Sequence, residues 1–354
     1  MRINKESIKN NRVVRKLYYL GRGILCQKNL KKQASETLDQ FGIEIAPEDE
    51  RKKRINDMVS MDRKYGFTAS EYINYRFEEK TERERLEFVA DWEHLGYTCA
   101  MNDPRNKDVF DNKWETYKRF RKYYKREVML CNEQTQFEQF ESFVNRHGRF
   151  ILKPLNLSCG KDVRIMNVND HPDLHLLLTE LLTSYQHRFI MEELIVQVPE
   201  LSKFHPASVN TLRMPTIRFD DETIIVHPQL RMGQHNSVVD NAGAGGIKGA
   251  IDVDTGCILS AVDNFGHVYL THPDSGEKIV DTQIPYWEEA KRFVKELAEI
   301  VPENRYTGWD LALTKNGWVL VEANRRAQFG FQMSLQQGFR KEINGYLKRL
   351  GTKY

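Results

Sequence analysis

The pattern of apolar residues changes near residue 128, and this change limits the folds that the chain can adopt. Before it, charged residues dominate and apolar residues recur every three or four positions, as in Ala69 to Tyr75 and Thr81 to Leu95, which is typical of amphipathic helices. From Phe150 onward, β-branched runs bounded by Gly, Pro, Asn and Asp are typical of strands. The sequence therefore predicts a helical N-terminal region followed by a sheet-rich body, an α+β fold.

The sheet-rich part does not alternate strand and helix regularly. We expect strands at 150–153, 163–166, 189–196, 209–218, 223–231, 249–253 and 257–262, then a hairpin within 308–324, with helices at about 172–185, 286–300 and 335–350. This order disfavours a Rossmann domain, and neither a GxGxxG nor a Walker A sequence occurs. A mixed, largely antiparallel sheet system is expected instead.

Composition and charge narrow the class of protein. With 354 residues and 40% hydrophobic content, the chain can form a large core or two domains. The net charge of +3 is small, but the charged residues are unevenly distributed along the chain. Residues 1–32 form a basic arm, with ten basic side chains and a single acid, Glu6. This arm suggests contact with an anionic partner, such as a membrane surface, nucleic acid or an acidic saccharide, and a solvated helical face is the alternative. Five scattered cysteines without a CxxC pair, and the absence of an apolar leader, favour a cytoplasmic protein.

The hairpin near the C-terminus carries a set of oxygen ligands. Two apolar runs are separated by a Lys315-Asn316-Gly317 turn, and Glu322 and Asn324, two residues apart, leave the same face of the second run. Asp310 on the first run can reach them across the hairpin. Mg²⁺ prefers such oxygens together with substrate phosphates. The hairpin therefore predicts a magnesium site, and a surface hairpin with an acidic polar face is the alternative.

A lysine and a small polar loop form a second candidate site. Lys153 ends an apolar strand, and the loop that follows contains Ser158, Gly160 and Lys161 before the next strand. Backbone N–H groups of such a loop can cover phosphates while Lys153 supplies a positive charge. An ordinary hairpin with an exposed lysine is the alternative.

An apolar strand that ends in two acids predicts an adenine-binding segment. Glu192 and Glu193 interrupt the run before Leu194 and Ile195, and Glu200 follows, where it could accept ribose hydroxyls. Which of the two adjacent acids faces adenine is left open. Two solvated acids at a strand end are the alternative.

Two arginines and a glycine-rich stretch predict a place for developing negative charge. Arg213 and Arg231 lie on neighbouring predicted strands and suit a carboxylate or a phosphate, although either alone could form a structural ion pair. The stretch with Asn241, Gly245 and Gly246 precedes a strand and is typical of a loop that closes on a ligand. A long hairpin turn is the alternative.

Taken in chain order, these motifs resemble the ATP-grasp superfamily, most closely its sugar-transfer-associated branch, which is similar to glutamate-ligase-like enzymes. The resemblance covers roughly residues 105 to 340. It implies an ATP-grasp fold, in which two α+β subdomains grip ATP, with a helical basic region at 1–104, a small lobe at 105–200 and a large lobe at 201–354. Asp111-Asn112-Lys113 resembles the first nucleotide lysine of the family, and Lys153 matches the second.

The resemblance also implies a role for each motif. The residues expected to bind ATP are Lys113, Lys153, Ser158, Gly160, Lys161, Glu192, Glu193, Leu194, Ile195 and Glu200. Those expected to act on the reacting groups are Arg213, Arg231, Asn241, Gly245 and Gly246, and those expected to hold two Mg²⁺ ions are Asp310, Glu322 and Asn324.

The implied activity is an ATP- and Mg²⁺-dependent carboxylate-amine ligase that forms an amide through an acyl phosphate. This activity implies a small-molecule carboxylate and an amine as substrates. The expected acid is a sugar acid or an amino acid in polysaccharide or secondary biosynthesis. The alternatives are a small-molecule kinase, or a module that binds nucleic acid or a membrane surface through the basic arm and Lys113 to Arg126. A nucleic-acid partner is not expected, because it would leave the acids of the hairpin unused, and the oligomeric state is left open.

Besides the doubled acids Glu192 and Glu193 of the adenine-binding segment, the chain departs from the family pattern in two further places. Residues 1–100 look helical where the family usually has an α/β domain, and Arg325-Arg326 follows the metal asparagine where small residues or proline are usual. The two arginines lead to the hypothesis of an anionic acceptor.

Overall fold

The N-terminal part of the molecule is helical, as predicted. The computed structural model describes residues 27–156, 162–235, 237 and 245–352. Its first helices are α3 (Gln27–Gln40), α4 (Glu48–Tyr65), α5 (Ala69–Asn74), α6 (Glu82–Arg85), α7 (Asp91–Met101), α8 (Lys107–Asp111) and α9 (Lys113–Tyr124), with 3₁₀ turns at Phe77–Glu79 and Pro104–Asn106. Capping boxes begin α5 and α6, where Thr68 and Thr81 bind reciprocally to the glutamates three residues later. None of the described helices has the length and hydrophobicity needed to cross a membrane.

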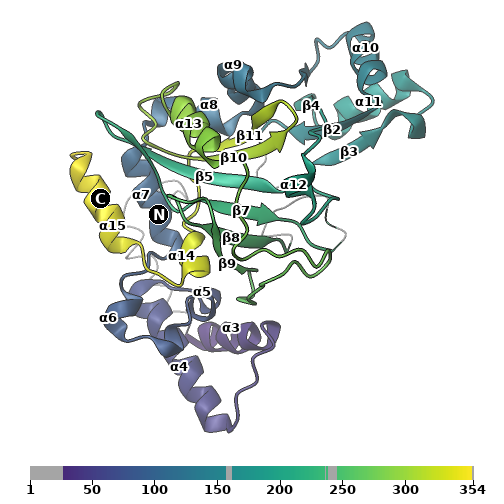
Figure 1. Cartoon of the computed structure of the whole chain (residues 1–354). Coiled ribbons are helices and arrows are strands. Elements are labelled where there is room, and N and C mark those ends of the chain that lie inside the picture. The colour runs from purple at the N-terminus through teal and green to yellow at the C-terminus, as the bar shows by residue number, and fades with distance from the viewer. Residues whose placement is uncertain (1–26, 157–161, 236, 238–244, 353–354) are drawn as a thin grey trace, which may run out of the picture.

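A small antiparallel sheet follows these helices (Figure 1). It has the strand order β1-β4-β2-β3, formed by β1 (Val128–Cys131), β2 (Arg149–Pro154), β3 (Arg164–Asn167) and β4 (Phe189–Glu193). Helices α10 (Phe137–His147) and α11 (Leu174–Ser184) pack on one face through a cluster that includes Phe140, Phe150 and Leu181, and a 3₁₀ turn at Val168–Asp170 connects β3 to α11. This sheet is the small lobe.

A larger antiparallel sheet forms the centre of the molecule. Its strand order is β11-β10-β5-β7-β8-β9, with β6 paired to β5. The strands are β5 (Thr211–Arg218), β6 (Thr223–Ile225), β7 (Gln229–Met232), β8 (Ile247–Ile251), β9 (Ile258–Val262), β10 (Tyr306–Thr314) and β11 (Gly317–Asn324), and the accompanying helices are α12 (Pro199–Ser202), α13 (Trp287–Ala298), α14 (Phe331–Leu335) and α15 (Arg340–Arg349).

The two faces of this large sheet differ in chemistry. Leu212, Leu230 and Trp309 point to one face, where α9 and α13 cover them in the main hydrophobic core. Alternate residues of the same strands, including Arg213 and Asp310, point to the opposite face. Burial of the apolar face thus fixes the strand register and gathers the charged side chains on the other face.

The observed elements differ from the predicted ones in several details. The predicted strand 223–231 is split into β6 and β7, because His227 takes a positive φ of 44° just before Pro228. The predicted helix over 81–95 is broken, since Phe88 and Ala90 are buried between α6 and α7. The prediction also lacked β1 and α10. Helices α8 and α9 pack with the core of the large sheet, and the lobe boundaries at 104/105 and 200/201 remain a proposal.

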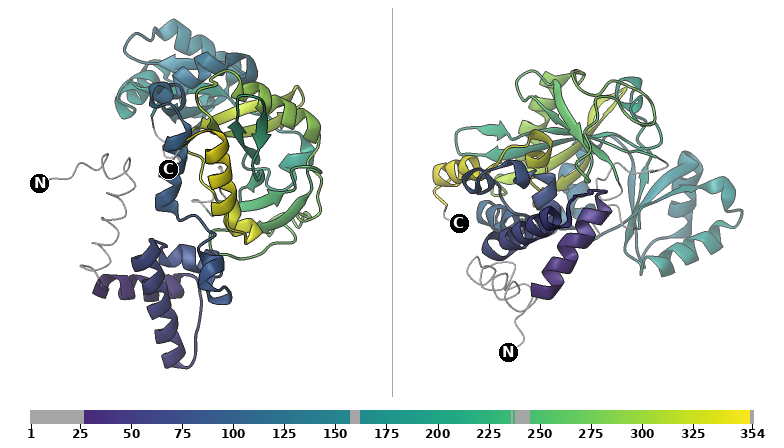
Figure 2. Two further views of the ribbon diagram at one scale, coloured as in Figure 1. Left: turned by 90° about the vertical axis from the view of Figure 1, so that its left-hand side faces the viewer. Right: turned by 90° about the horizontal axis from the view of Figure 1, so that it is seen from below.

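The N-terminal helices lie beyond the edge strand β9 (Figure 2). Leu38 and Met58 share a hydrophobic cluster with Val262 of β9 and Met333 of α14. Arg340 of α15 joins the two parts, because its guanidinium donates to both carboxylate oxygens of Glu93 and to the carbonyls of Leu86 and Phe88. We call residues 27–90 the helical region.

Candidate nucleotide and metal site

Asp310 lies at the centre of the charged face of the large sheet. It is opposite Glu322 on β11 and opposite Arg213 on β5 in the strand register. Arg213 makes a two-point ion pair with its carboxylate, with Nη2 2.8 Å from Oδ2, and Arg231 Nη1 lies 3.1 Å from the same oxygen. Burial alone would raise the pKa of Asp310, but the two arginines lower it. Asp310 is therefore an ionised, fixed anion.

Glu322 and Asn324 complete the predicted oxygen set. Asn324 Nδ2 lies 3.4 Å from Asp310 Oδ2, and Glu322 is partly buried directly across the ladder from Asp310. Its carboxylate has no hydrogen-bond partner among the described residues. Two carboxylates and an amide on neighbouring strands fit Mg²⁺ in their donor chemistry. In the described part of the chain, no group of three His, Cys, Asp or Glu side chains forms a metal site, so this set relies on Asn324 and on oxygens from a ligand.

Gly308 gives Arg213 the space to reach Asp310. A Cβ at this position would overlap Ala327 Cβ and lie 3.3 Å from Arg213 Cδ. The guanidinium therefore lies across a strand position that has no side chain.

Glu192 is an internal anion of the small lobe. Its side chain is 3% exposed and accepts from Lys153 Nζ at 3.0 Å and from Arg126 Nη2 at 2.7 Å. Burial would raise the pKa of Glu192, but Lys153 and Arg126 lower it to about 2. Glu193 is turned differently, since it accepts the backbone N–H of Glu127. The two adjacent acids thus have different partners. These contacts leave open which of the two faces adenine.

Lys113 interacts electrostatically with charged residues of both lobes. Burial lowers its pKa, while Glu322 and Glu192 oppose that change and Lys153 adds to it. The N-terminus of α9 and the strand β2 therefore place Lys113 and Lys153 close enough to the acids of both lobes to share one field. This is the arrangement that a polyphosphate bound between the lobes would need.

The predicted loops are seen in part. Ser158, Gly160, Lys161 and Asn241 lie outside the described residues. Gly245 has a φ of 94°, and its carbonyl accepts from the Gln234 side chain, while the buried Gly246 leads into β8. Leu194 and Ile195 are partly buried after β4, and Glu200 is exposed on α12.

Sequence reasoning missed Lys248. This residue is opposite Arg231 in the β7–β8 ladder, so it shares the charged face. Its Nζ donates to Asn264 Oδ1 at 2.7 Å. Burial, then Arg231 and Arg213, lower the pKa of Lys248 to about 8. In the sequence, Lys248 is only a lysine two residues after Gly246. Its place beside Arg231 becomes evident only from the pairing of β7 with β8.

Arg325 does not face an acceptor. Its side chain is 7% exposed and makes two hydrogen bonds of 2.8 Å to the carboxylate of Asp111. The anionic-acceptor hypothesis is therefore wrong for Arg325, because its charge ties the end of β11 to α8.

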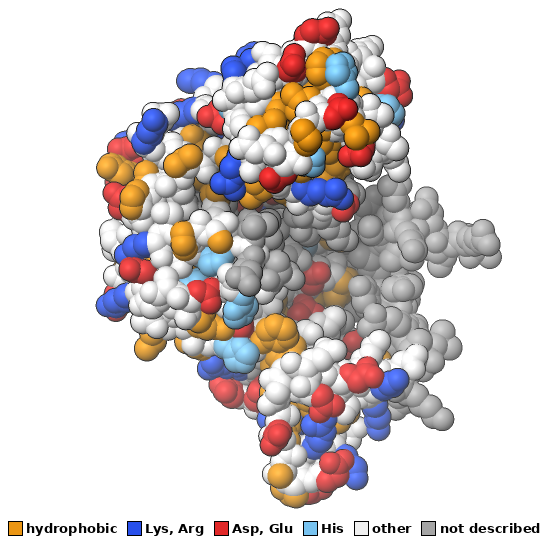
Figure 3. Space-filling model, turned by 90° about the vertical axis from the view of Figure 1, so that its right-hand side faces the viewer, with side chains coloured by type: hydrophobic (Ala, Val, Ile, Leu, Met, Phe, Trp, Pro, Cys, Tyr) orange, Lys and Arg blue, Asp and Glu red, His pale blue; other side chains and the backbone are white. Residues whose placement is uncertain are grey.

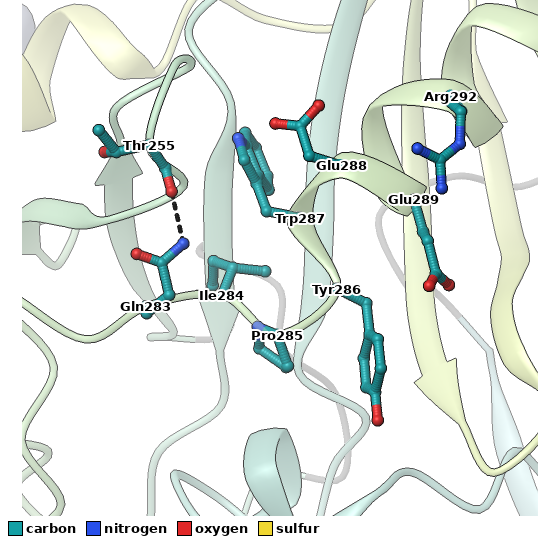
Figure 4. A pocket seen from close by; sticks show the side chains of 9 residues that line it. All are labelled: Thr255, Gln283, Ile284, Pro285, Tyr286, Trp287, Glu288, Glu289 and Arg292. Atoms are coloured by element: carbon teal, nitrogen blue, oxygen red, sulfur yellow. Dashed lines mark hydrogen bonds between the residues drawn. The ribbon is translucent and has the colours of Figure 1, made fainter.

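A hollow lies between the small lobe, the large lobe and the helical region (Figure 3). A separate open pocket of about 450 Å³ lies at the beginning of α13, and its walls contain none of the predicted site residues (Figure 4). Its lining includes Trp287, Glu288 and Arg292, with a hydrogen bond from the Gln283 side chain to the Thr255 carbonyl. This lining contains neither the paired lysines nor the acid-amide set of the predicted nucleotide site.

The two lobes and this charged face define the chain as an ATP-grasp protein. A family model described as sugar-transfer associated ATP-grasp matches residues 94–347. The chain belongs to that family. The helical region precedes the matched residues.

Several solved structures resemble the chain. The ATP-grasp ligase PsnB, complexed with minimal precursor, Mg and ADP, is 17% identical with a TM-score of 0.43, over 73% of this chain and 65% of that one. D-alanyl-alanine synthetase A from Vibrio cholerae is 9% identical with a TM-score of 0.45, over 71% and 67%. The chain thus spans less than two thirds of the PsnB chain, and likeness at this level says nothing about its substrate. No curated protein matches the sequence.

Proposed function

We propose that the protein is an ATP- and Mg²⁺-dependent carboxylate-amine ligase that activates its acid as an acyl phosphate. The observation that carries the proposal is the charged face of the large sheet, where Asp310, Glu322 and Asn324 lie beside Arg213 and Arg231. Carboxylates for a metal next to guanidinium groups for an anion suit transfer of a phosphoryl group to a carboxylate. Mg²⁺, when bound, would neutralise part of the phosphate charge.

The residues of the chain would divide the work between the two ends of the nucleotide. Lys113 and Lys153 supply positive charge to the phosphates, while Glu192 keeps Lys153 in place. Arg213 and Arg231 would lie where the acid and the transferred phosphoryl group meet, and they would stabilise charge on both. Amine attack on the acyl phosphate then gives an amide and releases phosphate, without a covalent enzyme nucleophile. A sugar acid or an amino acid is the proposed substrate.

A screen for ADP and phosphate release tests this proposal. Sugar acids and amino acids are supplied with and without amines, and we expect one acid to give ADP release that rises when the right amine is present. Glu322→Gln is the preferred blank, because Glu322 has no hydrogen-bond partner among the described residues, so we expect the variant to keep the fold. Asp310→Asn is a second blank, although it also leaves two arginines without their anion.

The kinase alternative has its own signature in the same screen. A stable phosphorylated product that forms without any amine requirement would identify a kinase. An acid-dependent ADP release that becomes coupled to amide formation identifies the ligase.

A further inference from the structure

Lys248 is a cation of the charged face that has an amide, and no carboxylate, as its partner among the described residues. Its Nζ donates to the neutral amide oxygen of Asn264, and no carboxylate lies within ion-pair distance of it in the described part of the chain. Burial lowers the pKa of Lys248, and Arg231 and Arg213 lower it further. A partly buried ammonium next to two guanidinium groups is unfavourable unless an anion joins it.

The acid that acts electrostatically on Lys248, Asp263, already has several hydrogen-bond donors. Asp263 influences Lys248 electrostatically, but its carboxylate accepts from the backbone N–H groups of Phe265 and His267, from His267 Nδ1 at 2.8 Å and from the Tyr269 hydroxyl at 3.0 Å. Asp310 is likewise held by both arginines. Among the described residues, Lys248 is therefore left without a carboxylate of its own.

The position of Lys248 separates that ligand from the nucleotide. Along the sheet, the acids lie on β10 and β11, the arginines on β5 and β7, and Lys248 on β8. It is therefore on the side of the arginines away from the metal set. Gly330 faces it without a side chain, since a Cβ there would lie 3.7 Å from Lys248 Nζ. Space thus remains beside the ammonium.

The loop that holds Lys248 also contacts the helical region. Asn264 is followed by Phe265, whose ring lies 5.3 Å from that of Phe41, and by Gly266, which approaches Asn74. The helical region, which precedes the residues matched by the family model, therefore borders this end of the site.

We propose that Lys248 binds the carboxylate of the acid substrate, at the end of the charged face next to the helical region. The inference rests on the proposed ligase function and adds to it the residue that positions the acid. An ammonium and two guanidinium groups would hold the carboxylate while the arginines also reach the phosphoryl group. The acid would then lie over the charged face at β8, beside the loop after β9 that contacts the helical region.

The test measures stabilisation of the enzyme saturated with Mg²⁺ and AMPPNP by sodium acetate, with acetamide as the neutral probe of the same shape. A ligand that binds the folded state raises the midpoint of thermal unfolding. We expect acetate, and not acetamide, to raise the midpoint of the wild type. Lys248→Met should weaken the apparent acetate affinity about tenfold, and Lys248→Arg should restore most of it.

Three other results of this experiment would contradict the proposed role of Lys248. Equal effects of acetate on the wild type and on Lys248→Met would overturn the inference while leaving nucleotide binding, and so the proposed function, standing. Stabilisation by inorganic phosphate in the Mg-ADP complex, without any acetate effect in the AMPPNP complex, would assign Lys248 to the transferred phosphate instead. Failure of the wild type to bind Mg-AMPPNP would overturn the proposed function itself.

Discussion

At the scale of single residues, the site depends on buried anions that are neutralised by several cations. Glu192 is shared by Lys153 and Arg126, and Asp310 by Arg213 and Arg231. Removing one member of such a set leaves an uncompensated buried charge, which costs more than the intact pair contributes. These residues therefore link stability to ligand binding.

Glu192→Gln should destabilise the protein by about 3 kcal/mol at pH 7, because Lys153 and Arg126 lose their shared anion. The pKa of Glu192 is lowered in the folded state to about 2, so its stabilisation is present above the ordinary glutamate range and is lost as the pH falls through 2. The gap between wild type and variant in urea unfolding should therefore shrink below about pH 4.5. Glu193→Gln is the matched control and should cost less at every pH. A gap that stays constant down to pH 2 would show that the charge of Glu192 is not the cause.

At the scale of secondary-structure elements, the large sheet positions the charged residues through its register. The antiparallel pairs Arg213–Asp310 and Asp310–Glu322 put three side chains from β5, β10 and β11 in one row. Arg231 and Lys248 extend that face onto β7 and β8. Because Gly308 has no side chain, Arg213 has the space to reach Asp310 in this row.

Gly308→Ala should destabilise the protein by roughly 1–3 kcal/mol, since its new Cβ would overlap Ala327 Cβ and crowd Arg213. The double variant Gly308→Ala/Ala327→Gly should recover much of this loss. Gly345→Ala, within α15 and without neighbours, is the control and should stabilise by about 0.5–1 kcal/mol. Chemical unfolding of the four proteins measures these changes, and an absence of recovery in the double variant would refute the overlap with Ala327.

At the scale of the whole molecule, the helical region is joined to the ATP-grasp body by Arg340. Its guanidinium donates hydrogen bonds to Glu93, Leu86 and Phe88 at the same time. A lysine ammonium lacks the planar set of donors that this arrangement requires. The hydrophobic cluster with Val262 and Met333 holds the same two parts together.

Arg340→Lys should lower the free energy of unfolding by about 2 kcal/mol and loosen the helical region, because a lysine cannot make this set of hydrogen bonds. Hydrogen exchange of α5 and α6 should accelerate before that of the large sheet. Arg349→Lys, on the same helix with exposed ion pairs to Asp221 and Glu222, should change stability far less than Arg340→Lys. Equal effects of the two substitutions would contradict this role for Arg340.

The part of this organisation that could be predicted from the sequence is the part that local patterns encode. The hairpin with Asp310 and Glu322 follows from its apolar runs and its turn, where Gly317 has a φ of 83°. The two cations that hold Glu192, the register that brings Lys248 beside Arg231, and the ion pair of Arg325 with Asp111 depend on contacts between distant segments. Such contacts are fixed by packing of the sheet and leave no signal in neighbouring residues.

The central claim is that the face with Asp310 and Glu322 holds a metal-bound nucleotide. Calorimetric titration of AMPPNP, with and without Mg²⁺, into the wild type and Glu322→Gln tests it most directly. We predict that Mg²⁺ tightens binding to the wild type by about tenfold or more, and that Glu322→Gln loses most of this gain. Equal affinities with and without Mg²⁺ in the wild type, or an undiminished gain in Glu322→Gln, would contradict the account.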